Sequence, residues 1–311
     1  MINHHVTVNG SQIYVVEHIP EVQPDLPSVI LVSGLGDTSV HWCAVQRLLP
    51  RHVRSFAYDR LGLGRSDRTS LARTAAVLAS ELKATLDACQ IPPPYLLVAS
   101  SYAGIICREF LESFDDQTAG LVYVDANQER TRLERQWPDE ASERIVTDAI
   151  DIDKSTGLAA AHRCTKNEWA EVVADEQRRR EEKKRGVDPV SAEGSLCDSS
   201  LFALGKHRQL DRQALGKRPL SVIVANLTRD IRRLFDSGKG AGLGTPEDHA
   251  LADQLCARLP AVELSLNTRV LKLSSIHRMV VTSISGHKVA LWEPDLCVQE
   301  IMWCLGRWGE A

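Results

Sequence analysis

The chain has 311 residues, of which 43% are hydrophobic and 25% are charged, so it is long enough for one large α/β core plus an inserted segment. The formal net charge of −4 provides no basic field for phosphate backbones, and we expect no nucleic-acid partner. The N-terminal residues Met1–His5 show no basic region followed by an apolar one, and no run approaches the length of a membrane span. We therefore expect a cytoplasmic protein with no membrane partner.

The eight cysteines are scattered along the chain without C-x-x-C spacing. Some, such as Cys107 and Cys304, fall within apolar helical patterns, where a reduced cysteine acts as a small buried hydrophobe. We expect free thiols in a reducing compartment, with no metal ion and no cofactor.

The chain begins with a strong hairpin signal, because His5–Val8 and Gln12–Glu17 flank the turn dipeptide Asn9-Gly10. Further along, short apolar runs alternate with helical patterns, as a parallel, doubly wound sheet requires. The expected buried strands are 28–33, 54–58, 95–100, 120–125, 219–225 and 278–284, and the expected helices are 38–50, 69–90, 103–114, 246–259 and 294–305. The prediction is an α/β fold with a mostly parallel, doubly wound, eight-stranded sheet.

The first buried strand leads into the glycine-rich turn 33–37. Gly34 and Gly36 would let the backbone approach a substrate closely, and Ser33 and Gly34 are candidate binding residues. The N–H of Leu35, together with that of Tyr102, could donate to a developing oxyanion. The alternative is an ordinary glycine turn between a strand and a helix.

The run 95–100 is an apolar strand that leads directly into Ser101, and small residues flank this serine. Ala99 and Ala103 stand where the nucleophile-elbow pattern G-x-S-x-G has its glycines. An elbow serine needs small neighbours because it lies on a strained turn, with its hydroxyl exposed and a helix N-terminus pointing at it. Ser101 is the candidate nucleophile.

His287 follows a short β-rich run and the dipeptide Ser285-Gly286, a setting typical of a loop that carries a general base. A lone histidine after a strand can also be a solvated loop residue. Its position far downstream of Ser101 fits the chain order serine, acid, histidine.

The acid that would complete a triad has two main candidates. Asp125 ends the strand after the elbow helix and is favoured. Asp230 follows the strand 219–225, but the intervening 226–229 makes a long turn. Glu247 and Asp248 remain further candidates, although they first indicate acids at a helix N-terminus.

These segments resemble the α/β-hydrolase superfamily, and so does 58–67, which is similar to the D-R-x-G-x-G-x-S segment that follows the fourth strand of that fold. We expect Asp59 and Arg60 to hold this loop through buried hydrogen bonds. The resemblance implies a serine hydrolase that cleaves an ester, lactone or thioester through Ser101, His287 and an aspartate, with an acyl-enzyme.

The resemblance covers the N-terminal half and the last few dozen residues, which leads us to expect a hydrolase core of 1–126 and 218–311 and an inserted helical cap of 127–217. This cap is rich in charge and contains the mixed-sign run 175–185, which predicts a solvated helix face. Its apolar residues, Trp137 and Trp169 among them, are candidates for the substrate-binding pocket.

Two functions of other classes stay open. The fold could serve as a ligand receptor with a vestigial triad, or it could catalyse a non-hydrolytic step such as cyclisation or C–C bond cleavage. In each case the expected partner is a small molecule, apolar or from specialised metabolism, and a homodimer stays open.

Overall fold

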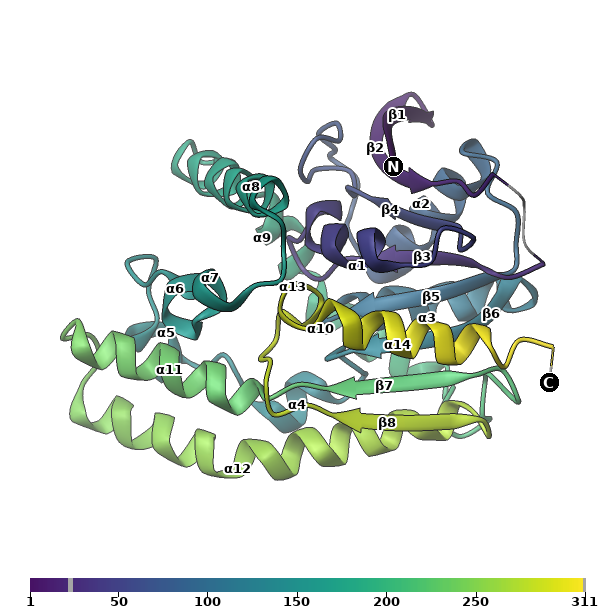
Figure 1. The fold of residues 1–311 in the computed structure, drawn as a ribbon. Coiled ribbons are helices and arrows are strands. Elements are labelled where there is room, and N and C mark those ends of the chain that lie inside the picture. The colour runs from purple at the N-terminus through teal and green to yellow at the C-terminus, as the bar shows by residue number, and fades with distance from the viewer. Residues whose placement is uncertain (22–24, 310–311) are drawn as a thin grey trace.

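The computed structural model describes residues 1–21 and 25–309. An eight-stranded sheet in the order β1-β2-β4-β3-β5-β6-β7-β8 crosses the molecule (Figure 1). The predicted hairpin is confirmed: β1 (Ile2–Val8) pairs antiparallel with β2 (Ser11–His18), and Asn9 and Gly10 between them both have positive φ, 50° and 85°. From β4 onward every strand pair of the sheet is parallel. The predicted fold class is confirmed.

The six strands expected along the chain are all present, with bounds shifted by no more than a few residues. They are β3 (Ser28–Val32), β4 (Ser55–Tyr58), β5 (Tyr95–Ser100), β6 (Thr118–Val124), β7 (Leu220–Val224) and β8 (His277–Val281). Helices cover both faces of the sheet, so alternate side chains of one strand enter different cores. Ile30 packs in the cluster that contains α2 and α3, and Leu31 packs in the cluster that contains α1 and α14.

The helices of the core differ from the predictions mainly in where they begin and end. They are α1 (Cys43–Leu48) after a short 3-10 turn, α2 (Ala75–Ala88), α3 (Ala103–Ser113), α12 (Pro246–Val270), α13 (Val289–Trp292) and α14 (Pro294–Leu305). The expected helix 69–90 was extended too far at its start, because the Thr74 side chain accepts the Val77 N–H and so caps α2. The helix α12 runs past the predicted end at 259. Pro260 destabilises the helix where it lies, but the burial of Leu266 and Val270 further along stabilises the helix by more than this loss.

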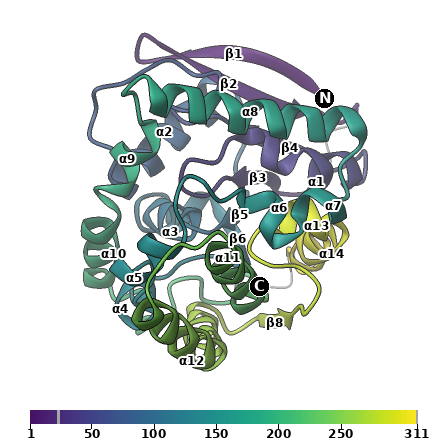
Figure 2. The ribbon, with the colours of Figure 1, turned by 90° about the vertical axis from the view of Figure 1, so that its left-hand side faces the viewer.

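The short α13 was not predicted, and neither was one longer helix of the core. The segment 226–229, expected as a long turn, is the start of α11 (Leu227–Gly240), and the Asn226 side chain accepts the Arg229 N–H as its N-cap. The helices α11 and α12 lie side by side and extend beyond the carboxyl ends of β7 and β8 (Figures 1 and 2).

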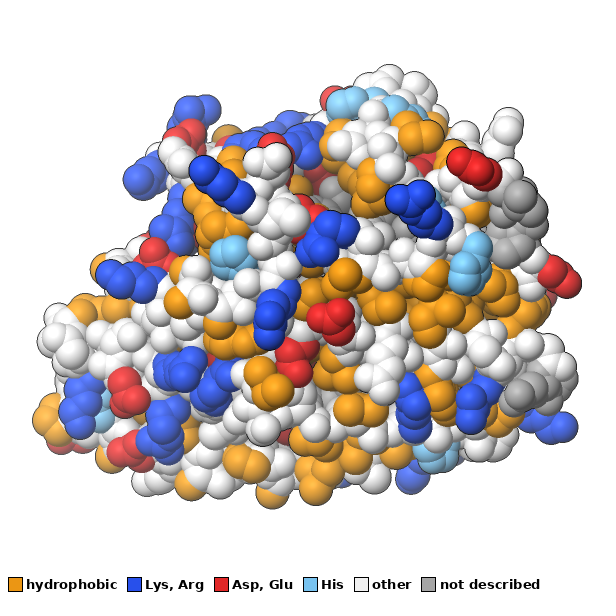
Figure 3. Space-filling model, in the orientation of Figure 1, with side chains coloured by type: hydrophobic (Ala, Val, Ile, Leu, Met, Phe, Trp, Pro, Cys, Tyr) orange, Lys and Arg blue, Asp and Glu red, His pale blue; other side chains and the backbone are white. Residues whose placement is uncertain are grey.

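The chain between β6 and β7 is helical and lies over the carboxyl ends of the parallel strands (Figure 1). It forms α4 (Thr131–Arg135), α5 (Glu140–Ile145), α6 (Ile152–Thr156), α7 (Leu158–Ala161), α8 (Lys166–Lys184), α9 (Pro189–Gly194) and α10 (Cys197–Lys206). Basic and acidic side chains are mixed over α8 and over α11 and α12 (Figure 3). None of the described helices combines the length and the apolar character needed to cross a membrane. The division into a core and a cap at 127 and 217 stays a prediction.

Candidate active site

Ser101 lies on a sharp turn between β5 and α3. Its φ is 54°, in the left-handed region that non-glycine residues avoid unless the surrounding structure holds them there. The Ser101 carbonyl accepts the N–H of Gly104 at 3.0 Å and that of Asn127 at 2.8 Å. A Cβ at Gly104 would lie 2.3 Å from the Asn127 carbonyl oxygen, so glycine is required for the turn to close. The local sequence thus produces the strained elbow that the small-residue pattern indicates.

The turn after β3 approaches this serine closely. A Cβ at Gly34 would lie 2.9 Å from the Ser101 Cβ, so the approach depends on the missing side chain. Leu35 and Tyr102 line the same cavity as Ser101, and within 1–21 and 25–309 their N–H groups donate to no other protein group. Ser33 is buried, and its hydroxyl donates to the Thr38 carbonyl at 2.8 Å. Ser33 and Gly34 therefore lie behind the cavity wall, where they shape the turn.

The two principal acid candidates contact His287 at different places. Asp125 Oδ2 lies 2.6 Å from His287 Nδ1, and the other Asp125 oxygen accepts the Ala225 N–H at 3.2 Å. Burial alone would raise the pKa of Asp125, but the hydrogen bond and charge of His287, with Arg135 nearby, hold it below its usual value. An ionised carboxylate on Nδ1 leaves the other ring nitrogen free to face a substrate.

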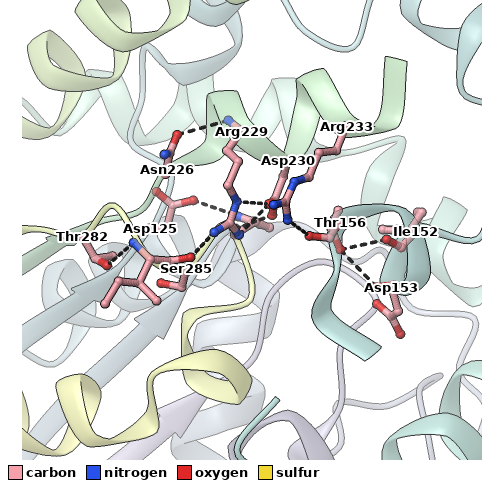
Figure 4. A network of polar contacts seen from close by, with 12 residues as sticks. Asp125, Ile152, Asp153, Thr156, Asn226, Arg229, Asp230, Arg233, Thr282 and Ser285 are labelled. Atoms are coloured by element: carbon pink, nitrogen blue, oxygen red, sulfur yellow. Dashed lines mark hydrogen bonds and ion pairs between the residues drawn. The ribbon is translucent and has the colours of Figure 1, made fainter. Parts of the chain in front are cut away.

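Asp230 contacts the main chain of His287 and not its ring. Its Oδ2 accepts the His287 N–H at 3.0 Å. Its other oxygen pairs with the neighbouring Arg229 at 3.0 Å (Figure 4). A Cβ at Gly286 would lie 1.8 Å from Asp230, so the glycine lets the loop close onto this carboxylate. The position of Asp230 follows from α11, because a helix that starts at Leu227 has Asp230 in its first turn.

The remaining acid candidates lie away from His287. Asp248 forms a capping box with Thr245 at the start of α12 and pairs with Arg144 at 2.7 Å. Glu247 is an exposed residue of the same first turn. Both fit the structural role that the sequence first indicates.

Ser101 and His287 open into one cavity of about 670 Å³. Its apolar wall comes from the loop after β3, from α11, from α13 and from the segment between β6 and β7. The apolar residues are Leu35, Trp137, Pro138, Ile152, Leu158, Val172, Leu201, Leu227, Ile231, Leu234, Leu291 and Trp292. Trp137 thus faces the cavity as expected. Trp169 does not line it and stacks on His162, with ring centroids 4.0 Å apart.

Sequence reasoning missed a polar corner of the cavity. Lys288 Nζ donates to both oxygens of Asp37, at 2.6 and 2.7 Å, and so joins the histidine loop to the turn after β3. Burial alone would raise the pKa of Asp37, but the neighbouring His41 and the ion pair with Lys288 hold it well below its usual value. Burial lowers the pKa of His41 to about 4 despite the neighbouring Asp37. The only signal in the sequence is the position of Lys288 directly after His287.

The structure also brings together two cysteines that lie far apart in the sequence and that no motif connects. The Sγ atoms of Cys43 and Cys164 lie 4.0 Å apart, and each has a ligand atom within 4.8 Å of a Glu168 carboxylate oxygen. Both residues are half-buried free cysteines, at the point where the start of α8 meets α1.

A mostly parallel sheet of eight strands, with the principal cavity at the carboxyl ends of its strands, is the architecture of an α/β hydrolase. A model of the alpha/beta hydrolase family matches residues 29–299, and the chain belongs to this family. An AB hydrolase superfamily protein of Gibberella zeae is 30% identical over 288 residues, which cover 91% of this chain and 87% of that protein.

Solved structures show the same fold. Cfl2 from Burkholderia cenocepacia has a TM-score of 0.63 and 16% identity, over 97% of this chain and 95% of that one. A putative aryl esterase from the same bacterium has a TM-score of 0.58 and 18% identity, over 98% of this chain and 100% of that one. At these identities the solved structures support the fold alone. The family match, together with the fold, establishes the protein as a hydrolase.

Proposed function

We propose that this hydrolase cleaves a carboxylic ester, lactone or thioester by acyl transfer, with Ser101 as nucleophile, His287 as base and Asp125 as the acid. The observation that carries the proposal is the 2.6 Å contact between the buried Asp125 and His287 Nδ1, because His287 lines the same cavity as the strained elbow serine. Nucleophile, base and orienting carboxylate are the three roles that this chemistry needs.

In the proposed reaction, the Ser101 hydroxyl attacks the substrate carbonyl while His287 removes its proton. Asp125 holds the imidazole in the tautomer that presents a free nitrogen to the serine and stabilises the imidazolium that forms. The N–H groups of Leu35 and Tyr102 donate to the oxyanion. His287 then protonates the leaving group and activates the water that hydrolyses the acyl-enzyme.

The cavity supports a substrate of modest size with a substantial apolar part. A volume of about 670 Å³ lies within the range of small-molecule sites. Its apolar wall is broken by the ion pair of Asp37 and Lys288 beside the histidine loop. Apolar contact would supply binding, and the few polar groups would orient the ligand, which fits a specialised metabolite with one cleavable acyl group.

The test compares wild type with Ser101→Ala on p-nitrophenyl esters of graded chain length and on lactones, with labelling by a fluorophosphonate. We expect wild type to be labelled at Ser101 and the variant to lose several orders of magnitude in turnover while it stays folded. A variant that keeps more than about a tenth of wild-type turnover would contradict the nucleophile assignment. Ligand binding without turnover of any ester or lactone would instead support a receptor or a non-hydrolytic enzyme.

A further inference from the structure

Arg60 is a fully buried cation that connects the turn after β3 to α9. Its Nη1 donates to the Ser33 carbonyl and its Nη2 to the Gly34 carbonyl, each at 2.7 Å. Its Nε and Nη2 donate to the two carboxylate oxygens of Glu193, again at 2.7 Å each. Both side chains are at most 1% exposed. A guanidinium with this fork geometry fixes the direction of each group that it binds.

The bond to the Gly34 carbonyl also fixes the N–H of Leu35. Carbonyl and N–H of one trans peptide point in opposite directions, and the Gly34–Leu35 peptide is not among the cis bonds of the described chain. Arg60 holds the carbonyl on the buried side, and the Asp37 N–H donates to the same oxygen at 3.1 Å. The Leu35 N–H is thereby directed away from Arg60, and Leu35 lies on the wall of the Ser101 cavity.

The helix α9 touches this turn at two further points. A Cβ at Gly36, where φ is 69°, would lie 2.6 Å from a Val190 methyl carbon, so Val190 packs directly on the turn. At the end of α9, a Cβ at Gly194 would lie 3.9 Å from a Leu35 methyl carbon. One short helix therefore covers the turn after β3 and supplies the carboxylate that neutralises Arg60.

We propose that Arg60 and Glu193 are positioning residues for the oxyanion hole, and that α9 completes the hole from the segment between β6 and β7. The inference rests on the proposed acyl transfer. With Glu193 in place, the neutralised guanidinium stays hydrogen-bonded to both carbonyls of the turn. Without it, the buried cation draws in water or another acceptor, because a buried charge needs a partner, and the Leu35 N–H loses its direction.

The experiment uses Glu193→Gln in the full chain, because glutamine keeps the size of the side chain and removes its charge. We expect kcat on a small activated ester to fall about 10- to 100-fold while KM changes less than about twofold. A misdirected donor weakens the stabilisation of the transition state and leaves the binding of the substrate almost unchanged. Affinity for a trifluoromethyl ketone, which forms a tetrahedral oxyanion on Ser101, should fall by the same factor. Binding of the carboxylic acid product should stay unchanged.

Glu182→Gln is the matched control. It makes the same substitution in the same segment and removes another ion pair between that segment and the core, Arg68–Glu182, which does not touch the turn after β3. This variant should keep wild-type kcat. If Glu193→Gln does not fold, Glu193→Asp keeps the charge but shortens the side chain, and it should show the same loss of kcat with KM retained.

Parallel results for Glu193→Gln and Glu182→Gln would overturn the proposal, as would a loss confined to KM or an unchanged affinity for the ketone. Fluorophosphonate labelling of wild type separates this failure from failure of the proposed function. If Ser101 of wild type is labelled and turns over esters, the acyl-transfer proposal stands whatever the Glu193 variants do.

Discussion

The sheet and the segment between β6 and β7 are held in place by different forces. Strand β6 is buried along its whole length and β5 along all but its last residue, so the turns that carry Asp125 and Ser101 end a tightly packed core. In α8, by contrast, only Val172 and Asp175 are buried. This helix is attached to the core through polar contacts, such as Arg47–Glu168 at 2.8 Å and Thr38–Asp175 at 2.9 Å.

The contrast has an energetic meaning. Burial of apolar strands is cooperative and insensitive to salt, whereas exposed ion pairs contribute about 0–1 kcal/mol each and are screened. We expect the reacting groups to keep their geometry under conditions that loosen α8. Arg60–Glu193 is one of the buried pairs between the two regions, and it joins them at the turn beside Ser101.

The largest expected effect comes from a substitution in the packed core, at the proposed acid. Asp125→Asn should reduce turnover on a p-nitrophenyl ester by up to about four orders of magnitude, because the amide favours the wrong imidazole tautomer. Asp230→Asn keeps an amide oxygen for the His287 N–H and should lose only roughly tenfold. Steady-state kinetics of both variants check this expectation. Equal losses would mean that the contact to the ring and the contact to the main chain matter equally.

A second test lies where the two regions meet, at His41, whose neighbourhood α8 covers. Its pKa of about 4 lies below the usual value of about 6.5, so the unfolded chain binds a proton there that the folded chain does not. This contribution to stability is fully present above about pH 6.5 and falls by up to about 3 kcal/mol as the pH drops toward 4.

His41→Gln should remove this part of the pH dependence. Denaturant unfolding of variant and wild type between pH 7 and 4 measures it, with the exposed His52→Gln as the control. The stability difference between wild type and the His41 variant should change steadily across that interval. A difference that is constant with pH would show that the folded chain leaves His41 with an ordinary affinity for protons.

The third test sharpens the distinction between packing and ligand contact within the segment between β6 and β7. Trp137→Ala should change the ratio of kcat/KM for a bulky and a small ester by the equivalent of about 1–3 kcal/mol, because Trp137 lines the cavity. Trp169→Ala should lower the melting temperature and leave that ratio unchanged, because Trp169 stacks on His162 and packs against the apolar cluster that contains Val172. A change of the ratio in both variants would place Trp169 in the binding site.

The smallest expected effect concerns the attachment of α8. Glu171→Gln removes an ion pair with Arg65 in which the Glu171 side chain is 57% exposed. The free energy of unfolding should fall by less than about 1 kcal/mol at low salt, and the difference should vanish in 1 M NaCl. Unfolding curves at both salt concentrations measure it. A difference that survives high salt would mean that packing, and not charge, holds this face.

The same contrast explains which parts of the molecule can be predicted from sequence. Short apolar runs indicate the buried strands, and the strand before Ser101 and the small residues beside it indicate the elbow serine. His287 and Asp125 follow from chain order and from the ends of strands. Apart from chain order, these signals are local and come from the densely packed core.

The features that were missed depend on contacts between distant segments. Arg60 and Glu193 are 133 residues apart, and no local pattern marks Glu193 as the partner of a buried arginine. Trp169 is indistinguishable from Trp137 by composition, and only packing separates a stacked ring from one that faces the cavity. The helix α11 is different, because Leu227, Ile231 and Leu234 recur with helical spacing and do indicate a helix.

The position of the proposed acid at the end of β6 affects how the pocket can change during evolution. With the carboxylate proposed at the end of β6, the end of β7 carries no reacting group, and α11 starts directly behind it. Three of its side chains, Leu227, Ile231 and Leu234, form cavity wall. Substitutions at these three positions can redraw the outline of the ligand without moving a reacting atom. The protein therefore has two cavity-lining surfaces on which its substrate preference can change, α11 and the segment between β6 and β7.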